Sequence, residues 1–336
     1  MRRKLRVMLI FLLFLITIIT KKPNMSEARC TWGGGFYKCR RPDLIGSLQN
    51  LPKRISHLDL EAMSEGTDFN FPRYTRAIVR EVPTSIRLKS EGFKDSSCVY
   101  VKRAREEHAL YVQTLRDLGL EVSVLPADED LPDGVFVEDT CVVVGDKALM
   151  TRPPMKARRK EVDSVEKCLK SLGIKTHRIY DKSAILEGGD VMFTGKEFFA
   201  GISIKSNLAG HKILAETFPE FPVHSIPVEE PEFHLKGMVC VAAPGTLVMP
   251  RNKWGKVAWE AVCEKSEYTY KPMWVPNHCG VNCLHINGTI VHCTEEDWPK
   301  SHQVFVETMG DYQRVQRSIG ELGKVEAGLT CCSVLF

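Results

Sequence analysis

Residues 187–202 read EGGDVMFTGKEFFAGI, and this stretch decides the fold. Two apolar segments, Val191–Phe193 and Glu197–Ile202, flank the turn-forming pair Thr194-Gly195, so the stretch predicts a β-hairpin. A helical pattern follows at Leu208–Phe218, and an apolar strand pattern follows at Val223–Pro227. The order is therefore two hairpin strands, a helix and a further strand.

The same order of elements recurs on both sides of this stretch. The last unit contains Asn287-Gly288, the strongest short hairpin pattern. A spacing of about 40–60 residues favours a radial array, which five units would close. The sequence thus predicts an α/β fold in which the loops that carry acids, histidine and cysteine converge on a central axis. The other predicted strands are Arg76–Glu81, Glu121–Leu125, Val135–Val144, Ala148–Thr151, Lys175–Tyr180, His234–Ala242, Leu247–Met249, Trp274-Val275, Val281–Ile286, Thr289–His292 and Gln313–Ser318, and the other predicted helices are Lys102–Leu118, Arg158–Leu172, Trp254–Lys265 and Ser301–Met309.

The composition is that of a globular protein. The 336 residues are 43% hydrophobic and 26% charged, enough to bury a sizeable core. The net charge of +4 is small for this length, and much of it lies in the first residues. Nucleic acid is therefore not expected as a partner.

The N-terminal segment, residues 1–24, resembles a targeting sequence. A basic start is followed by the apolar run Val7–Thr20, which is shorter than the roughly 20 residues of a membrane span. Three interpretations stay open: a signal peptide, a signal anchor, or a later start at Met25 or Met63. Residues 25–70 are expected to form a partly disordered extension, and residues 71–336 to form the folded domain.

Several polar residues stand out within the predicted units. Cys331 lies in a small, apolar stretch near the chain end, and a lone cysteine is a nucleophile only where histidine and a carboxylate meet it. His234 is placed at the start of a predicted strand. Glu138-Asp139 interrupt an apolar strand, and Glu187 and Asp190 bracket two glycines. Taken alone, each feature has a plainer explanation: Cys331 could be a buried structural cysteine, Glu138-Asp139 a charged strand end, and the two acids around the glycines a solvent-exposed turn.

In combination these motifs resemble dimethylarginine dimethylaminohydrolase, a family of the guanidine-modifying superfamily. The resemblance spans about residues 71–336. It rests on FVED (136–139), LEGGDV (186–191), HLK (234–236) and LTCCSV (329–334), with shorter matches at LPADE (125–129), TRP (151–153), RRKEV (158–162) and FTG (193–195).

The resemblance implies a five-bladed α/β propeller (pentein) of ββαβ units, in agreement with the repeat. It implies hydrolysis of methylated arginine to citrulline and a methylamine, which relieves methylarginine inhibition of nitric oxide synthesis. Cys331 is then the nucleophile and His234 the general acid and base. By the same resemblance, Asp133, Glu138, Asp139, Arg158 and Val325 contact the substrate, with Arg158 at its carboxylate.

The chemistry fits these residue types. Carboxylates that bind guanidinium N–H groups orient a poorly electrophilic carbon. Thiolate attack gives a covalent thiouronium intermediate, and His234 protonates the leaving amine before it activates water. Glu187 is expected to orient the imidazole. No cofactor or metal is required.

One position departs from the family pattern. Lys205 lies where a second arginine is usual, and lysine offers a point charge instead of a two-pronged donor. Substrate preference is therefore open. The loop Leu88–Lys94, where the family has a lid, also matches poorly, and no lid contact is predicted.

Two other functions are considered. An arginine or agmatine deiminase would use the same Cys-His-acid chemistry. A non-catalytic zinc-binding or regulatory protein could use a set of soft ligands around one hairpin: Cys279, Cys283, His285, His292 and Cys293. Inhibitory zinc at Cys331 and His234 is a further expectation, since thiolate and imidazole suit it.

The expected partner is a small cationic amino acid. A free catalytic thiol favours the cytoplasm. If residues 1–24 direct the chain to the secretory route or anchor it to a membrane, Asn287-Gly288-Thr289 becomes a glycosylation sequon.

Overall fold

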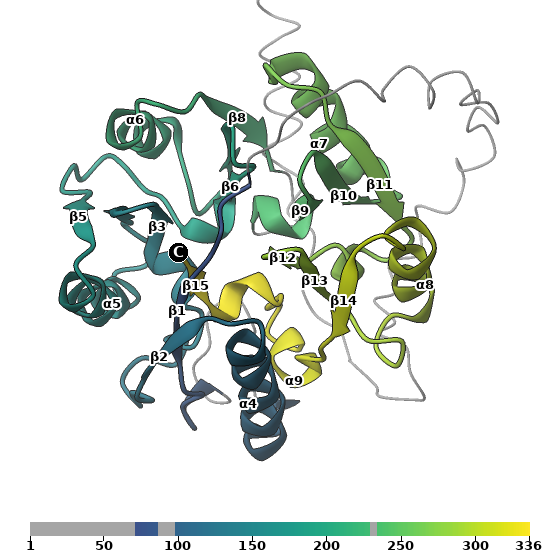
Figure 1. Ribbon diagram of the computed structural model, residues 1–336. Coiled ribbons are helices and arrows are strands. Elements are labelled where there is room, and N and C mark those ends of the chain that lie inside the picture. Colours follow the sequence, from purple (N-terminus) through teal and green to yellow (C-terminus); the bar gives the residue numbers. More distant parts are fainter. Residues whose placement is uncertain (1–70, 87–97, 229–233) are drawn as a thin grey trace, which may run out of the picture. The chain divides into compact units, whose positions relative to one another are not determined.

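The computed structural model describes residues 71–86, 98–228 and 234–336. The chain divides into two units, Met1–Glu65 and Gly66–Phe336, and every described residue belongs to the second. The described residues of this second unit form five three-stranded sheets connected by helices (Figure 1). The predicted N-terminal segment and extension, residues 1–24 and 25–70, lie outside the described residues.

All five sheets are built in the same way. The middle strand pairs antiparallel with one neighbour and parallel with the other. The second to fifth sheets are β3 (Cys141–Val144), β4 (Lys147–Met150) and β5 (Lys175–Arg178); β6 (Val191–Phe193), β7 (Phe198–Ile202) and β8 (Val223–Pro227); β9 (Cys240–Ala243), β10 (Thr246–Pro250) and β11 (Lys271–Val275); and β12 (Leu284–Ile286), β13 (Thr289–His292) and β14 (Gln313–Gln316).

The first sheet is completed by the end of the chain. Its middle strand, β1 (Arg76–Arg80), pairs parallel with β2 (Glu121–Leu125) and antiparallel with β15 (Val334–Leu335). No strand was predicted at residues 334–335. This pairing fixes the segment that carries Cys331 to the first sheet.

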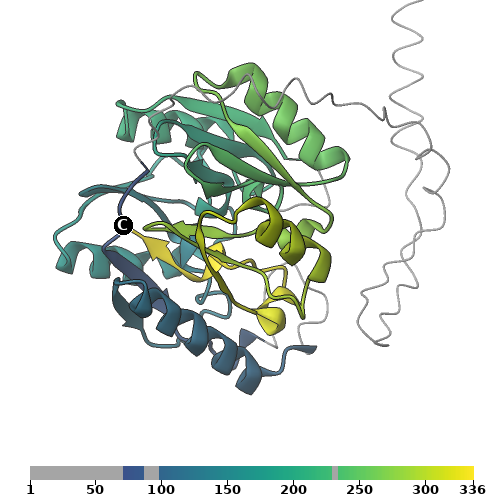
Figure 2. The ribbon, with the colours of Figure 1, turned by 45° about the vertical axis from the view of Figure 1, so that its right-hand side comes forward.

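The helices connect the parallel strands, which a short turn cannot join. They are α4 (Val101–Asp117), α5 (Arg159–Ser171), α6 (Leu208–Thr217), α7 (Lys253–Lys265) and α8 (Pro299–Thr308), with a further short helix α9 (Gly320–Gly323). In Figures 1 and 2, α4 to α8 lie outside the sheets that they connect. The predicted order of hairpin, helix and strand is confirmed in the second to fifth sheets. In the first sheet only the order of strand, helix and strand is present, and β15 pairs where the other hairpin strand would lie.

The predicted hairpin turn at Asn287-Gly288 is also confirmed. Asn287 has φ 50° and Gly288 has φ 90°. Positive φ at both central residues is what a two-residue turn between antiparallel strands requires.

Three predicted strands begin later in the structure than in the prediction. Val135–Val144 contains a short 3₁₀ turn, η2 (Val137–Thr140), before β3. His234–Ala242 contains η4 (Leu235–Gly237) before β9, and Val281–Ile286 shortens to β12, which follows η5 (His278–Gly280). In a strand, Glu138 and Asp139 would point to opposite faces. The tighter turn buries both carboxylates instead.

Five hydrophobic clusters hold the sheets together, and each cluster joins two of them. Ile78 of the first sheet packs with Ala148 of the second, and Leu149 of the second packs with Phe198 of the third. The next clusters join the third sheet to the fourth and the fourth to the fifth. The last cluster joins β1 to β12 and β13 through Ala77, Ile286 and Val291.

Within residues 71–86, 98–228 and 234–336, no helix has both the length and the apolar character needed to cross a membrane.

Candidate active site

Four short turns, each preceding a strand, lie against one another. η2 contacts η3 (Gly188–Asp190) and η6 (Thr330–Cys332), and η3 contacts η4. These turns carry the polar motifs that the sequence singled out. The structure thus brings together residues that are up to about 190 positions apart.

His234 is held by two buried carboxylates. Its Nε2 lies 2.8 Å from Oε2 of Glu187 and 3.7 Å from Oδ1 of Asp139. Burial opposes protonation of the ring, but the charges of Asp139, Asp190 and Glu187 and the Glu187 hydrogen bond outweigh it and raise the pKa of His234 to about 10. His234 is therefore a protonated donor at neutral pH.

Arg158 neutralises the same carboxylates. Its Nη1 donates to Oδ2 of Asp139 at 2.9 Å and lies 3.6 Å from Oε2 of Glu187. Its Nε and Nη2 donate to Glu161, which stands in the first turn of α5, where a negative charge is favoured. The predicted substrate-carboxylate ligand thus already binds two carboxylates of the protein. We call Arg158, Asp139, Glu161 and Glu187 the Arg158 cluster.

The Arg158 cluster shifts its own acids in opposite directions. Burial raises the pKa of Glu161 to about 7, although Arg158 opposes the shift. Burial also acts to raise the pKa of Asp139, but the charges of His234 and Arg158 and the hydrogen bonds that Asp139 accepts lower it overall. Asp139 is therefore the ionised partner of His234.

Glu138 belongs to a separate network beside Cys331. Its Oε1 accepts from Nζ of Lys236 at 2.7 Å, and its Oε2 accepts from Oγ1 of Thr330 at 2.9 Å. Lys236 also donates to the carbonyl of Gly188 at 3.1 Å. Neither Lys236 nor Thr330 was predicted to have a role in the site. The cost of burying Glu138 without a cation was the feature that could have identified Lys236.

Cys331 is half-buried in η6, next to Thr330. Its Sγ accepts from the backbone N–H of Gly328 at 3.3 Å. Burial, followed by the charges of Glu138 and Asp139, raises the pKa of the Cys331 thiol well above its usual value. Without a further cation the sulfur is a protonated thiol, and protonated thiols are weak nucleophiles.

Two glycines of the EGGD motif permit this close packing. A Cβ at Gly189 would lie 2.6 Å from Nδ1 of His234 and 2.9 Å from Oδ1 of Asp139. A Cβ at Gly188 would lie 1.9 Å from the carbonyl oxygen of Glu138. The glycine pair therefore brings η3 against both the histidine and the acids.

Asp190 links the histidine to the segment of Lys205. Its Oδ1 accepts from the backbone N–H of Leu235 at 2.9 Å, and its Oδ2 accepts from Oγ of Ser203 at 2.6 Å. Ser203 Oγ in turn accepts from the backbone N–H of Lys205 at 2.8 Å. Lys205 is buried, and its segment is connected through Ser203 and Asp190 to Leu235, the residue that follows His234.

The two remaining predicted contact residues lie at the edges of these networks. Asp133 is buried, and its charge helps to raise the pKa of Glu161. Val325 packs in the hydrophobic cluster against which Cys331 also packs. The predicted lid segment, Leu88–Lys94, lies outside the described residues.

One set of side chains in the described part of the chain has metal-binding spacing. Ligand atoms of Asp139, Glu187 and His234 lie within 4.8 Å of one another. Arg158 already supplies the cation for these acids, which disfavours a metal there. The hairpin zinc set around Cys283 and His285 forms no such group among the described residues.

The sequence matches known proteins along most of its length. The family model described as "N,N dimethylarginine dimethylhydrolase, eukaryotic" matches residues 88–251. The human protein "Putative hydrolase DDAH2" is 35% identical over 78% of this chain and 95% of its own length. The N(G),N(G)-dimethylarginine dimethylaminohydrolase of Streptomyces coelicolor is 28% identical over 74% of this chain and 95% of its own.

Solved structures share the fold. A dimethylarginine dimethylaminohydrolase crystallised as an adduct with S-methyl-L-thiocitrulline aligns with a TM-score of 0.68 at 22% identity, covering 78% of this chain and all of that one. The N-terminal domain of a cyanobacterial arginine dihydrolase, ArgZ, aligns with a TM-score of 0.66 at 16% identity, covering 79% of this chain and 97% of that one. The identity to the human relative and the length that it covers show that this chain belongs to the dimethylarginine dimethylaminohydrolase family.

Proposed function

We propose that the protein hydrolyses Nω-methylated arginine to citrulline and a methylamine, and thereby relieves methylarginine inhibition of nitric oxide synthesis. The observation that carries the proposal is the convergence of a protonated His234, its partners Glu187 and Asp139, and the Glu138–Thr330 network beside Cys331. The names of the family relatives supply the substrate class.

In this mechanism Cys331 is the nucleophile. The bound guanidinium is the cation that a buried thiol beside two acids otherwise lacks, so substrate binding favours the thiolate, and the thiol proton is lost to solvent. The sulfur attacks the guanidinium carbon, and the bond to the methylated nitrogen breaks as His234 gives that nitrogen a proton. The product of this half is free methylamine and a thiouronium on Cys331.

In the second half of the reaction, His234 acts as a general base instead of a general acid. His234 takes a proton from water, and the hydroxide adds to the thiouronium carbon. The carbon–sulfur bond then breaks and the added hydroxyl group loses its proton to solvent, which releases citrulline and leaves the thiolate beside protonated His234. Glu187 keeps the imidazole oriented and stabilises its charged form in both halves.

The proposed substrate contacts follow from the charge of each side chain and its position in the site. Asp133, Glu138 and Asp139 are proposed to bind the guanidinium N–H groups. Lys205 is proposed to bind the carboxylate, with Val325 contributing its backbone carbonyl. Arg158 would reach the substrate only by exchanging one of its present carboxylate partners.

A second candidate is the hydrolysis of unmethylated arginine or agmatine. It is favoured by Lys205, which lacks the two-pronged geometry of arginine, and by the fold shared with the arginine dihydrolase. The test is citrulline formation by the full-length protein from dimethylarginine, monomethylarginine and arginine, and carbamoylputrescine formation from agmatine, compared as kcat/KM. Higher kcat/KM for arginine or agmatine would exclude the first proposal.

We propose that residues 71–336 form this catalytic domain and that its five sheets are the blades of a propeller. Five hydrophobic clusters support this arrangement, because they join each sheet to the next and the fifth to the first. For the compartment we propose the cytoplasm, in which the nucleophilic thiol of Cys331 would stay reduced. N-terminal sequencing of the natural protein tests the start site and the use of residues 1–24.

A further inference from the structure

Asn282 is a half-buried polar residue that contacts the turns of both proposed reacting residues. It lies between η5 and β12, at the start of the fifth sheet. Among the described residues, the hydrogen bonds of its amide all lead out of that sheet, to Thr330 of η6 and Lys236 of η4. Thr330 directly precedes Cys331 in the chain, and Lys236 follows His234 by two positions. One side chain thus links the segment of the nucleophile to that of the general acid.

The orientation of the amide follows from its partners. Oδ1 of Asn282 accepts from the backbone N–H of Thr330 at 2.9 Å, and a backbone N–H can only donate. Nδ2 donates to the carbonyl oxygen of Lys236 at 3.3 Å, and a carbonyl oxygen can only accept. Nδ2 also donates to Oγ1 of Thr330 at 3.1 Å. Exchanging the oxygen and nitrogen of the amide would break the first two bonds, so the contacts fix one orientation.

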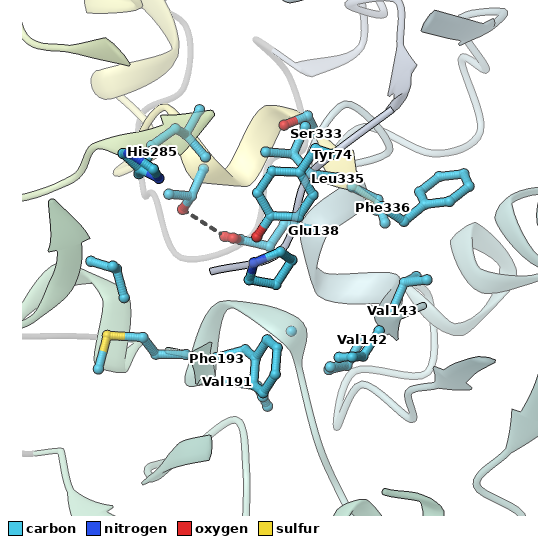
Figure 3. Close-up of a pocket in the computed structure, with 18 of the residues that line it drawn as sticks. Tyr74, Glu138, Val142, Val143, Val191, Phe193, His285, Ser333, Leu335 and Phe336 are labelled. Atoms are coloured by element: carbon cyan, nitrogen blue, oxygen red, sulfur yellow. Dashed lines mark hydrogen bonds between the residues drawn. The ribbon is translucent and has the colours of Figure 1, made fainter. Parts of the chain in front are cut away.

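The bond to Oγ1 also directs the hydroxyl group of Thr330. Since Oγ1 accepts a proton from Asn282, its own proton is available to Glu138, and it donates to Oε2 at 2.9 Å. The dashed line that ends on Glu138 in Figure 3 is this bond. Asn282 therefore supports the carboxylate that is proposed to bind the guanidinium, and it does so through the residue next to Cys331.

The backbone of Gly328 lies directly against the same amide. A Cβ at Gly328 would lie 2.2 Å from Cγ of Asn282 and 2.5 Å from both Oδ1 and Nδ2. Gly328 and Cys331 close a turn, in which the N–H of Cys331 donates to the carbonyl of Gly328 at 3.2 Å and the N–H of Gly328 donates to Sγ at 3.3 Å. The bond to Sγ acts against the rise in the pKa of the thiol that burial causes. Asn282 thus packs against the donor that favours the thiolate.

We propose that Asn282 is a positioning residue of the proposed hydrolysis: its amide holds the turn that carries Cys331 against the turn that follows His234, and so fixes where the sulfur lies relative to the imidazole. This role rests on the proposed function, because the position of the sulfur affects a rate only if Cys331 reacts. It requires no contact between Asn282 and the substrate.

The first test is the alkylation of Cys331 in the full-length protein without substrate, which does not depend on hydrolysis. Iodoacetamide reacts with the thiolate, and mass spectrometry of the digested protein gives the rate constant at Cys331 at pH 9. Asn282→Ala should slow this reaction about tenfold, the factor expected for the loss of one hydrogen bond to a charged sulfur. Asn277→Ala, which removes another half-buried amide of the same segment, should react like the wild type. A rate in Asn282→Ala at or above that of the wild type would overturn the proposal, because a turn that is merely loosened exposes the sulfur.

A second variant tests the same contact from the opposite side and keeps the amide in place. Gly328→Ala sets a methyl group against Asn282, so it should slow the alkylation of Cys331 by a similar factor, whereas Gly323→Ala, with no atom within 4 Å of its Cβ, should not. In the double variant of Gly328→Ala and Asn282→Ala the truncated side chain leaves room for the methyl group, so its rate should be no lower than that of Asn282→Ala. A rate that falls by the product of the two single effects would show that the residues act independently and would contradict the assignment.

Turnover of dimethylarginine separates this role from the proposed function. In Asn282→Ala, kcat should fall by about 10²-fold, as expected for a displacement of about 1 Å, and in Asn277→Ala it should keep the wild-type value. An unchanged kcat in Asn282→Ala would overturn the positioning role. A wild type that hydrolyses neither methylated arginine, arginine nor agmatine would instead overturn the proposed function, and the alkylation rates would still decide whether Asn282 positions the sulfur.

Discussion

At the scale of single residues, the position of His234 is set by contacts from three directions. Glu187 fixes Nε2, Asp190 fixes the following backbone N–H, and Gly189 leaves room for the ring. The sequence motifs identified the polar residues. They could not show that Arg158 already binds Asp139 and Glu161, because a side chain's partner depends on the fold.

Removing the charge of Glu187 should lower the pKa of His234. In Glu187→Gln the side chain keeps its size but no longer stabilises the imidazolium. We expect kcat/KM to fall by about 10²-fold or more, and its alkaline limb to move to lower pH. The pH profile of kcat/KM measures both effects. Glu220→Gln, at an exposed position, is the control, and an unshifted alkaline limb in Glu187→Gln would refute the role of Glu187.

A methyl group at Gly189 should displace the histidine without removing any functional group. The Cβ of Gly189→Ala would lie 2.6 Å from Nδ1 of His234, so the ring must shift. Since a displacement of about 1 Å can cost about 10²-fold in rate, we expect a loss of that order in kcat. Gly310→Ala, with no atom within 4 Å of its Cβ, should keep wild-type activity. Equal kcat in both variants would contradict the packing argument.

At the scale of elements, the hairpin, helix and strand order was predictable because apolar periodicity and Asn-Gly or Thr-Gly turns mark it locally. The short turns η2 and η4 were read as strands. Their apolar neighbours resemble a strand, but their buried acids and histidine need hydrogen bonds from other segments. The last strand, β15, was not predicted, because two residues are too few to show the alternation of apolar and polar side chains that marks a strand.

The strand β15 should contribute measurably to stability. Val334 is 6% exposed and packs with Ile78 between the first and second sheets. Val334→Ala removes the two buried γ-methyl groups of the side chain, so the free energy of unfolding should fall by about 2 kcal/mol. Urea denaturation measures the change. Val124→Ala, on an exposed face of β2, should stay within about 0.5 kcal/mol of wild type, and a similar small change in Val334→Ala would argue against a closing role for β15.

At the scale of the whole molecule, buried histidines define the pH range of stability. Burial lowers the pKa of His108, His285 and His292 to about 4, below the usual 6.5. Folding therefore favours the neutral imidazoles. Their contribution to the free energy of unfolding is present above pH 6.5 and is lost as the pH falls towards 4. His234 has the opposite sign, because its raised pKa stabilises the fold below pH 6.5 and this contribution is lost as the pH rises towards 10.

The free energy of unfolding should therefore decrease on both sides of a maximum near neutral pH. Urea denaturation from pH 4 to pH 10 checks this. His177→Gln, at an exposed histidine, should leave the curve unchanged. A stability that stays constant between pH 6.5 and pH 4 would show that the three buried histidines are not neutral in the fold.

The proposed attack of Cys331 on the guanidinium of methylated arginine can be tested by trapping its covalent intermediate. Full-length protein is mixed with dimethylarginine, quenched in acid within milliseconds to seconds, and digested for mass spectrometry of the peptide that contains Cys331. We expect a transient thiouronium adduct on Cys331, formed with release of dimethylamine and decaying to citrulline, and no adduct in Cys331→Ser. Citrulline formation by Cys331→Ser, or an adduct on the neighbouring Cys332 instead, would contradict it.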